Sequence, residues 1–328
     1  MMQQKPSDPL SQGSRQTQAF LQTRNRRDRT ARKAFFGITL IPVLLIIVIT
    51  CLLVIRAWPI LSSQPLANLM LGEVWKPTNE QFGLLPFILG TVWVTLVGVI
   101  LAVPACLLVA IYLAEYARRS TRTIAKPVLD LLAAIPSVVY GVWGLLVIVP
   151  FVDDILGPFF HRWLGFVPVF SVTQPTGFGI FAGGIVLAVM IAPLIIAVTF
   201  EVLSTVPDEL RQASLSLGAT RWQTISRVVL PRVLPGIIAA VVLGASRALG
   251  ETMAVLMVVG NVPSIPTSIF DTAYPLAALI ANNFGEMMSI PLYDAALLSA
   301  ALLLLVIIMI FNILSTFVLQ RILGKARI

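Results

Sequence analysis

Six long apolar stretches alternate with polar segments along this chain. They cover approximately 34–55, 87–113, 127–151, 180–200, 236–260 and 292–319. An α-helix needs about 20 mostly apolar residues to cross the hydrocarbon core of a bilayer, and each stretch is long enough to do so. The pattern therefore predicts an all-α integral membrane protein whose six transmembrane helices form one domain over residues 34–328.

Four of the predicted spans contain proline, at Pro42, Pro104, Pro136 and Pro193. Proline removes a backbone hydrogen bond and bends a helix, but packed membrane helices tolerate it. We therefore expect kinked spans.

The first 33 residues are polar, and six basic residues cluster between Arg24 and Lys33. This composition predicts a disordered basic tail near anionic lipid headgroups. A nucleic-acid-binding arm finds no further support in the sequence. Because the first apolar stretch begins only at Ala34, we expect no cleaved leader.

The basic residues predict the topology. With the N-terminus in the cytoplasm, inner segments hold 19 Lys and Arg and outer segments hold three, namely Arg56, Lys76 and Arg162. Cytoplasmic loops of membrane proteins carry this excess. The count predicts a multi-pass protein of the bacterial inner membrane with both termini inside. The last outer connection, 261–291, contains apolar residues for a short surface or re-entrant helix.

Composition and missing motifs narrow the function. Hydrophobic residues make up 58% of the chain and charged residues 12%, against about a quarter charged in soluble domains. The sequence contains no GxxxxGK[ST] loop for ATP phosphates, and His161 is the only histidine. We find no metal-ligand spacing, no nucleophile–base pair and no sign of a cofactor. The chain is therefore predicted to be a transport subunit that uses an external motor or an ion gradient, and not an enzyme.

The polar connection 201–235 is long for an inner loop. Pro207 followed by two acidic residues is typical of a helix start, and Gly218 suits a left-handed helix end. A second helix is predicted from near Thr220, interrupted at Pro231 and Pro235. A short helix pair of this kind, facing the cytoplasm, is suited to contact a partner protein.

The same loop resembles the import permeases of the ATP-binding-cassette (ABC) family. Their motif reads E-A-A, three residues, Gly, nine residues, Ile, any residue, Leu-Pro. This chain has Gln212-Ala213-Ser214, Gly218 and Val228-Val229-Leu230-Pro231 at that spacing, with departures at Gln212, Ser214 and Val228. The resemblance implies that the loop couples the permease to an ATPase. The implied coupling residues are Glu209, Gln212, Ala213, Ser214, Gly218, Ala219, Leu230 and Pro231.

Two further segments are similar to the PstC-type phosphate permeases. They are 131–144, which reads LLAAIPSVVYGVWG, and 247–261, which begins RALGETMAV and ends in Gly-Asn. The resemblance implies a type I ABC importer permease fold with cytoplasmic coupling helices. It also implies the partners, namely a second permease of PstA type, two cassette ATPases, an external phosphate-binding protein and phosphate itself, with membrane lipid around the spans.

Arg247 and Glu251 lie near the middle of the fifth predicted span. At a spacing of four they would share one helix face. A charge at mid-bilayer costs roughly 2.5–3.5 kcal/mol on insertion scales, so such residues usually face a cavity and mark a substrate path. The alternative is a self-neutralising pair that only joins two helices.

Three functions fit these observations. The first is a permease that imports phosphate. The second is a cassette permease for another substrate, such as sulfate, molybdate or a polyamine, although a mid-membrane arginine favours an anion. The third is a gradient-driven secondary transporter. Such transporters often contain two inverted halves, and the sequence contains no such repeat.

Overall fold

The computed structural model describes residues 9–171, 176–286, 290 and 292–325. The chain divides into two compact units, residues 1–55 and 56–328, and each is described by itself. Helices and strands have the following bounds: α1 Pro9–Ser63, α2 Leu66–Leu71, β1 Trp75–Lys76, β2 Gln81–Phe82, α3 Leu85–Ile111, α4 Arg119–Ala134, α5 Ser137–Trp143, α6 Val149–Phe151, α7 Gly157–Leu164, α8 Ile180–Ser204, α9 Asp208–Ser216, α10 Arg221–Thr224, α11 Leu230–Leu249, α12 Met253–Leu256, α13 Leu276–Asn283 and α14 Tyr293–Lys325.

Short turns of other helix types join several of these helices. Wider π-helical turns occupy Tyr112–Tyr116, Gly144–Ile148, Val152–Leu156 and Ile225–Val229. Tighter 3₁₀ turns occupy Pro77–Asn79 and Pro168–Phe170. The strands β1 and β2 pair antiparallel in a small hairpin, so the connection before α3 is not entirely helical.

Among the described residues, six helices are long and apolar enough to cross a membrane, as predicted. They are Ala31–Ser63, Leu85–Tyr116, Ser137–Leu164, Ile180–Ser204, Arg221–Leu249 and Tyr293–Arg321. The third and fifth differ from the predicted spans because each predicted span contains a break, after Ala134 and after Leu249. The short helix predicted within 261–291 is α13.

The N-terminal segment differs from its prediction. The structure continues α1 back to Pro9, whereas we expected no regular structure before Ala34. This segment is rich in Gln and Arg, which favour helix, and from Pro9 to Lys33 it contains only one glycine and no further proline. The part of the predicted tail before Pro9 lies outside the described residues.

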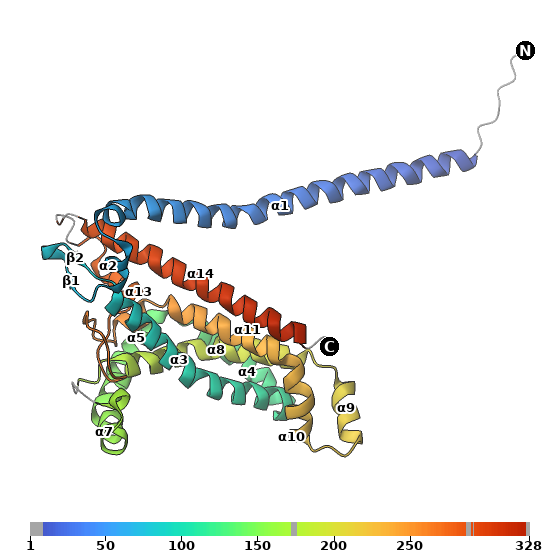
Figure 1. The fold of residues 1–328 in the computed structure, drawn as a ribbon. Helices are drawn as coiled ribbons and strands as arrows, with labels where there is room; N and C mark the ends of the chain where they lie inside the picture. The colour runs from blue at the N-terminus through green and yellow to red at the C-terminus, as the bar shows by residue number, and fades with distance from the viewer. Residues whose placement is uncertain (1–8, 172–175, 287–289, 291, 326–328) are drawn as a thin grey trace, which may run out of the picture. The chain divides into compact units, whose positions relative to one another are not determined.

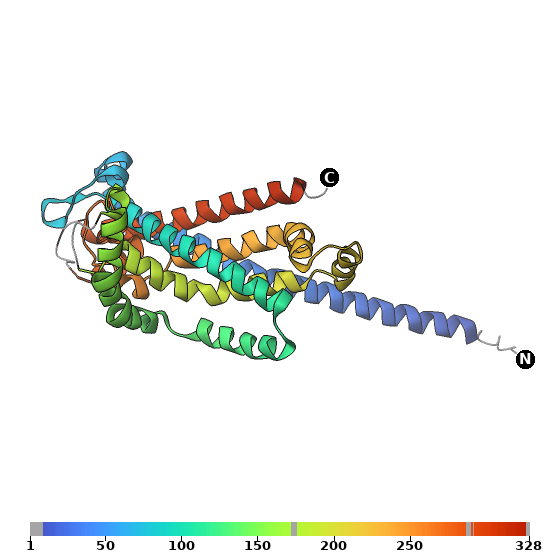
Figure 2. The ribbon, with the colours of Figure 1, turned by 90° about the horizontal axis from the view of Figure 1, so that it is seen from below.

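The core of the larger unit is built around α8. Figures 1 and 2 show α8 beside α3 and α11, with α14 on the other side of α11. Adjacent glycines allow this close approach. A Cβ atom at Gly184 would lie 2.9 Å from Cβ of Val97 on α3, and one at Gly183 would lie 2.7 Å from Cγ1 of Val259. Between membrane helices, small residues bring the backbones together and increase dispersion contacts.

The two ends of this unit differ in structure. The hairpin, α7 and α13 lie at one end, whereas α9, α10 and the C-terminal end of α14 lie at the other (Figures 1 and 2). At the first end Trp75 packs against a second core, and its ring meets Phe82 and Phe87 edge-on at 5.4 and 5.2 Å. This arrangement agrees with the alternation of inner and outer connections predicted from the charges.

The glycine contact between α3 and α8 can be tested by overpacking. We expect Gly184→Val to destabilise the protein by about 1–3 kcal/mol, because the new side chain meets Val97. Gly37→Val is the matched control, since a Cβ atom there meets nothing within 4 Å. Thermal unfolding of the purified proteins in detergent, followed by tryptophan fluorescence, measures the difference. Equal unfolding midpoints for the two variants would show that the contact carries no stability.

Candidate functional site

The two helix breaks adjoin each other in the folded chain. The first follows α4, where Ile135 and Pro136 are extended, and the second follows α11 at 250–252. The short helices that resume after them, α5 and α12, pack directly together. Gly141 permits this contact, because a Cβ atom there would lie 3.1 Å from Cα of Ala254.

A tyrosine satisfies the backbone at the first break. Pro136 has no N–H and so cannot donate to the carbonyl four residues earlier, that of Leu132. The hydroxyl of Tyr140 donates to this carbonyl at 2.8 Å, and the N–H of Ile135 does so at 3.3 Å. This role of Tyr140 was not among the predictions from the sequence. A hydroxyl in an apolar span, four residues after a proline, is the signal that indicates it.

A glutamate satisfies the second break. The N–H of Glu251 donates to the carbonyl of Ala248 at 3.2 Å, which ends α11. The side chain of Glu251 then accepts a hydrogen bond from the N–H of Ala254 at 3.1 Å, in the first turn of α12. Glu251 is therefore a half-buried cap of a new helix.

This geometry corrects the prediction that Arg247 and Glu251 share a helix face. The helix ends at Leu249, and no ion pair within 4 Å joins the two residues in the described structure. Gly250, followed by Glu and Thr, favours the break. Arg247 is exposed on this chain and lies near enough to the Tyr140 hydroxyl for an electrostatic interaction.

The helix pair predicted after Pro207 is confirmed. Gly218 has φ +84° and ends α9 in a Schellman motif. The N–H groups of Gly218 and Ala219 donate to the carbonyls of Leu215 and Ser214 at 3.0 and 3.3 Å. The next helix, α10, begins with a capping box of Thr220 and Gln223. The motif therefore sets the angle between α9 and α10.

The predicted coupling residues divide between the surface and the base of this helix pair. Glu209, Gln212, Ala213 and Gly218 are exposed, and the hydroxyls of Ser214 and Thr224 lie 2.9 Å apart and join α9 to α10. Ala219 and Leu230 are half-buried, and Pro231 is exposed at the start of α11.

The helix after Thr220 is not interrupted at its prolines, contrary to the prediction. A π-helical turn over Ile225–Val229 runs directly into α11, and α11 continues through Pro231 and Pro235. A proline ring clashes with the carbonyl four residues earlier. The wider turn immediately before Pro231 moves that carbonyl aside, so the helical axis continues.

Arg211 attaches the helix pair to the membrane helices, a role that the sequence analysis missed. Its Nη2 lies 2.9 Å from Oε1 of Glu115, and the two side chains are 17% and 9% exposed. Glu115 belongs to the π-helical turn Tyr112–Tyr116, which continues α3 and forms with it the α3 segment. Arg211 also donates to the carbonyls of Leu203 and Val206 and to Asp208. A guanidinium group presents five donors in a rigid fork, which suits this set of acceptors.

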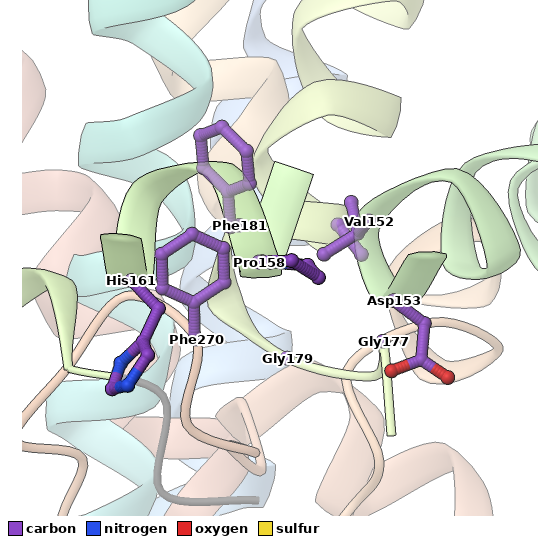
Figure 3. Close-up of a pocket in the computed structure, with 10 residues that line it drawn as sticks. Val152, Asp153, Pro158, His161, Gly177, Gly179, Phe181 and Phe270 are labelled. Atoms are coloured by element: carbon purple, nitrogen blue, oxygen red, sulfur yellow. The ribbon is translucent and has the colours of Figure 1, made fainter. Parts of the chain in front are cut away.

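Each of the two end regions contains a cavity. The cavity at the hairpin end, of about 320 Å³, lies between the start of α7 and the start of α8. Figure 3 shows Asp153 and His161 at opposite sides of it, with the rings of Phe181 and Phe270 between them. In the described part of the chain no group of three His, Cys, Asp or Glu side chains could hold a metal ion. This cavity is mostly aromatic and apolar.

Comparison with known proteins matches this architecture to a transport family. The family described as "Binding-protein-dependent transport system inner membrane component" matches residues 106–325, which include the helix pair and both breaks. A PstC phosphate transport system permease protein of Pasteurella multocida (strain Pm70) is 36% identical over 85% of this chain and 87% of its own length. A PstC protein of Mesorhizobium japonicum is 36% identical over 91% of this chain and 95% of its own length.

Solved structures support the fold. A chain of the inward-facing MetNI methionine ABC transporter superposes with a TM-score of 0.53 at 18% identity, over 76% of this chain and 99% of that chain. A chain of a bacterial alginate ABC transporter gives a TM-score of 0.51 at 21% identity, over 74% of this chain and 80% of that chain. The predicted fold class, a permease of the type I ABC importers with six membrane helices, is therefore confirmed.

Proposed function

The chain belongs to the family of inner-membrane components of binding-protein-dependent transport systems, and on that premise we propose that it is the permease subunit that carries inorganic phosphate through an ATP-driven importer. The observation that carries the proposal is its similarity, over most of both chains, to proteins named PstC phosphate permeases. A permease for another oxyanion remains the alternative. Family membership disfavours a gradient-driven transporter.

Permeases of this family act with a separate ATPase and an external binding protein. We propose the finer composition from the resemblance of the loop and spans. A second permease of PstA type completes the membrane channel, two cassette ATPases supply energy, and an external phosphate-binding protein delivers the substrate.

The proposed orientation places α9, α10 and both termini in the cytoplasm. The 19-to-3 distribution of basic residues supports it. An impermeant thiol reagent tests it on single cysteines at 154 and 219, in a background without Cys51 and Cys106. In intact spheroplasts we expect labelling at 154 and none at 219. Labelling at 219 alone would show that the orientation is the opposite of the one proposed.

The helix pair α9–α10 is the proposed docking element for the ATPase. Leu217 and Trp222 at its tip are 90% and 56% exposed, which leaves large apolar side chains for a protein partner. Arg211 joins the base of the pair to Glu115. A movement of the ATPase would therefore pass through a fixed contact into the α3 segment, and the pair would not swing freely.

Gly218 gives a sharp test of this coupling role. We expect Gly218→Val to assemble but to lose most ATP-driven uptake, because a left-handed conformation costs a side-chain-bearing residue about 1–2 kcal/mol. Space is not the cause, since a Cβ atom there meets nothing within 4 Å. Gly218→Asn is the matched control, because asparagine tolerates this conformation. Normal uptake by the valine variant would show that coupling does not depend on the backbone conformation at Gly218.

The proposed substrate path passes the adjoining helix breaks. Arg247 is exposed on this chain and has no carboxylate partner within 4 Å among the described residues. Its planar fork suits the oxygens of phosphate, and it stays charged at any cellular pH. Glu251 is positioned separately and could accept a hydrogen bond from the P–OH group of protonated phosphate.

Neutralising Arg247 tests both the path and the substrate. In proteoliposomes that contain the whole complex, we expect Arg247→Gln to lower ATP-driven uptake of labelled phosphate by roughly 10-fold to 100-fold, the effect of losing hydrogen bonds to a charged group. Arg247→Lys should restore part of the rate, because it keeps the charge and loses the fork. Arg232→Gln, on an exposed residue of the same helix, is the control.

Two results would contradict these assignments. Wild-type uptake by an assembled Arg247→Gln complex would show that Arg247 is structural. If excess sulfate abolishes the uptake of labelled phosphate by the wild type, the result would instead favour a permease for another oxyanion. Glu251→Gln keeps the acceptor for Ala254 and removes only the charge, so a loss of discrimination against sulfate in that variant would support the role of Glu251.

A further inference from the structure

A second cavity, of about 360 Å³, opens at the base of the helix pair α9–α10. This volume lies at the low end of the range for small-ligand sites, roughly 300–1,000 Å³. Its polar side chains come from five segments and are Glu115, Arg122, Ser204, Asp208, Arg211, Arg221 and Thr224. None of them belongs to the proposed substrate path, which lies at the two helix breaks.

The charges in this cavity do not balance. Three guanidinium groups line it with two carboxylates. Both carboxylates are bound to one arginine, because Arg211 pairs with Glu115 at 2.9 Å and with Asp208 at 3.2 Å. Arg122 and Arg221 therefore have no carboxylate partner within 4 Å in the described structure, and they leave the cavity positive.

Arg122 also has an unused donor. Its Nη2 donates to the carbonyl of Ala114, at the end of the α3 segment. Its Nε is buried and has no hydrogen-bond partner. A buried donor without an acceptor costs about 1–3 kcal/mol, more for a charged group. An oxyanion that enters the cavity would neutralise the charge, and a rotation of the Arg122 side chain would let Nε donate to it.

We propose that this cavity is a cytoplasmic binding site for a phosphoryl oxyanion, held between Arg122 and Arg221 with the Thr224 hydroxyl beside it. Arginine forks suit phosphoryl oxygens. The anion can come from free inorganic phosphate in the cytoplasm or from the headgroup of an anionic lipid, since both present the same group.

The position of the site gives it a regulatory role, an inference that rests on the proposed function. Arg122 belongs to α4, and Arg221 belongs to α10 within the helix pair. A bound anion would tie the pair to α4, in addition to its tie to Glu115 through Arg211. The Arg211 contact joins the pair to one helix, whereas an added tie to α4 would resist movement of the pair and α3 relative to α4, so occupancy of this site slows transport.

Direct binding is measured first, on the purified complex without its external binding protein. Equilibrium dialysis against labelled inorganic phosphate should detect a site that Arg122→Gln and Arg221→Gln each weaken by about tenfold. Arg227→Gln is the matched control, because Arg227 is exposed on the neighbouring segment and does not line the cavity. All variants are also measured in an Arg247→Gln background, which removes phosphate bound at the proposed substrate path. Binding that the two cavity variants leave unchanged would overturn the proposal for free phosphate.

Transport then tests the role of the site and its ligand source. Proteoliposomes that expose the cytoplasmic face inside are prepared from phosphatidylcholine, with or without phosphatidylglycerol, and with or without internal phosphate. We expect internal phosphate, or phosphatidylglycerol, to slow initial uptake in the wild type and in Arg227→Gln but not in the cavity variants. The addition that slows uptake, internal phosphate or phosphatidylglycerol, identifies the source of the bound anion. If neither arm distinguishes the cavity variants from the wild type, the site does not regulate transport.

The same experiment separates this inference from the proposed function. If wild-type vesicles without internal phosphate carry no phosphate at all, the proposed function fails. The dialysis measurement still decides whether the cavity binds an oxyanion. If uptake proceeds normally and is indifferent to internal phosphate and to lipid charge, only the regulatory site fails.

Discussion

The hydrocarbon core of a bilayer offers no hydrogen-bond partner to a backbone N–H or carbonyl group, and the structure of this chain follows from that constraint. Continuous helices satisfy it at most positions. Where a helix breaks, the chain supplies a replacement from nearby. Tyr140 takes the Leu132 carbonyl that Pro136 leaves free, and Glu251 caps the helix that resumes after Gly250. Non-helical backbone inside a bilayer is tolerated only where protein buries it or where it lines a cavity. The two breaks adjoin each other and Arg247 lies beside them, which is why we place the substrate path there.

Outside the hydrocarbon the polar contacts are of a different kind. The helix pair α9–α10 owes its shape to backbone capping at Gly218 and Thr220, and Arg211 attaches it to Glu115. Arg211 binds Glu115 and two backbone carbonyls at once, and both ionic side chains are largely buried. Removing one member of such a pair leaves an uncompensated charge, which is more costly than never having had the pair. The contact therefore fixes the helix pair in one position relative to α3. An element that transmits movement from an ATPase requires such a fixed position.

Patterns of neighbouring residues in the sequence predicted the membrane helices and the helix pair. Apolar length located six membrane helices, and Pro207 and Gly218 located the start and end of α9. The errors arose where one signal was taken alone. The apolar stretch over 236–260 was interpreted as a single helix, although Gly250-Glu251-Thr252 is a capping sequence within it. Pro231 was expected to interrupt a helix, but a π-helical turn absorbs it. Glu115 and Arg211 are 96 positions apart, and no local pattern indicates that they meet.

If the Arg211–Glu115 pair links ATPase-driven movement to the membrane helices, the two residues must depend on each other in transport. A double-mutant cycle on ATP-driven uptake measures this dependence, with Arg211→Gln, Glu115→Gln and the double variant in the assembled complex. We expect the double variant to transport no more slowly than Arg211→Gln alone, with a coupling free energy of about 1 kcal/mol or more. If the two losses instead add to within about 0.5 kcal/mol, the residues act independently and the pair is not the link.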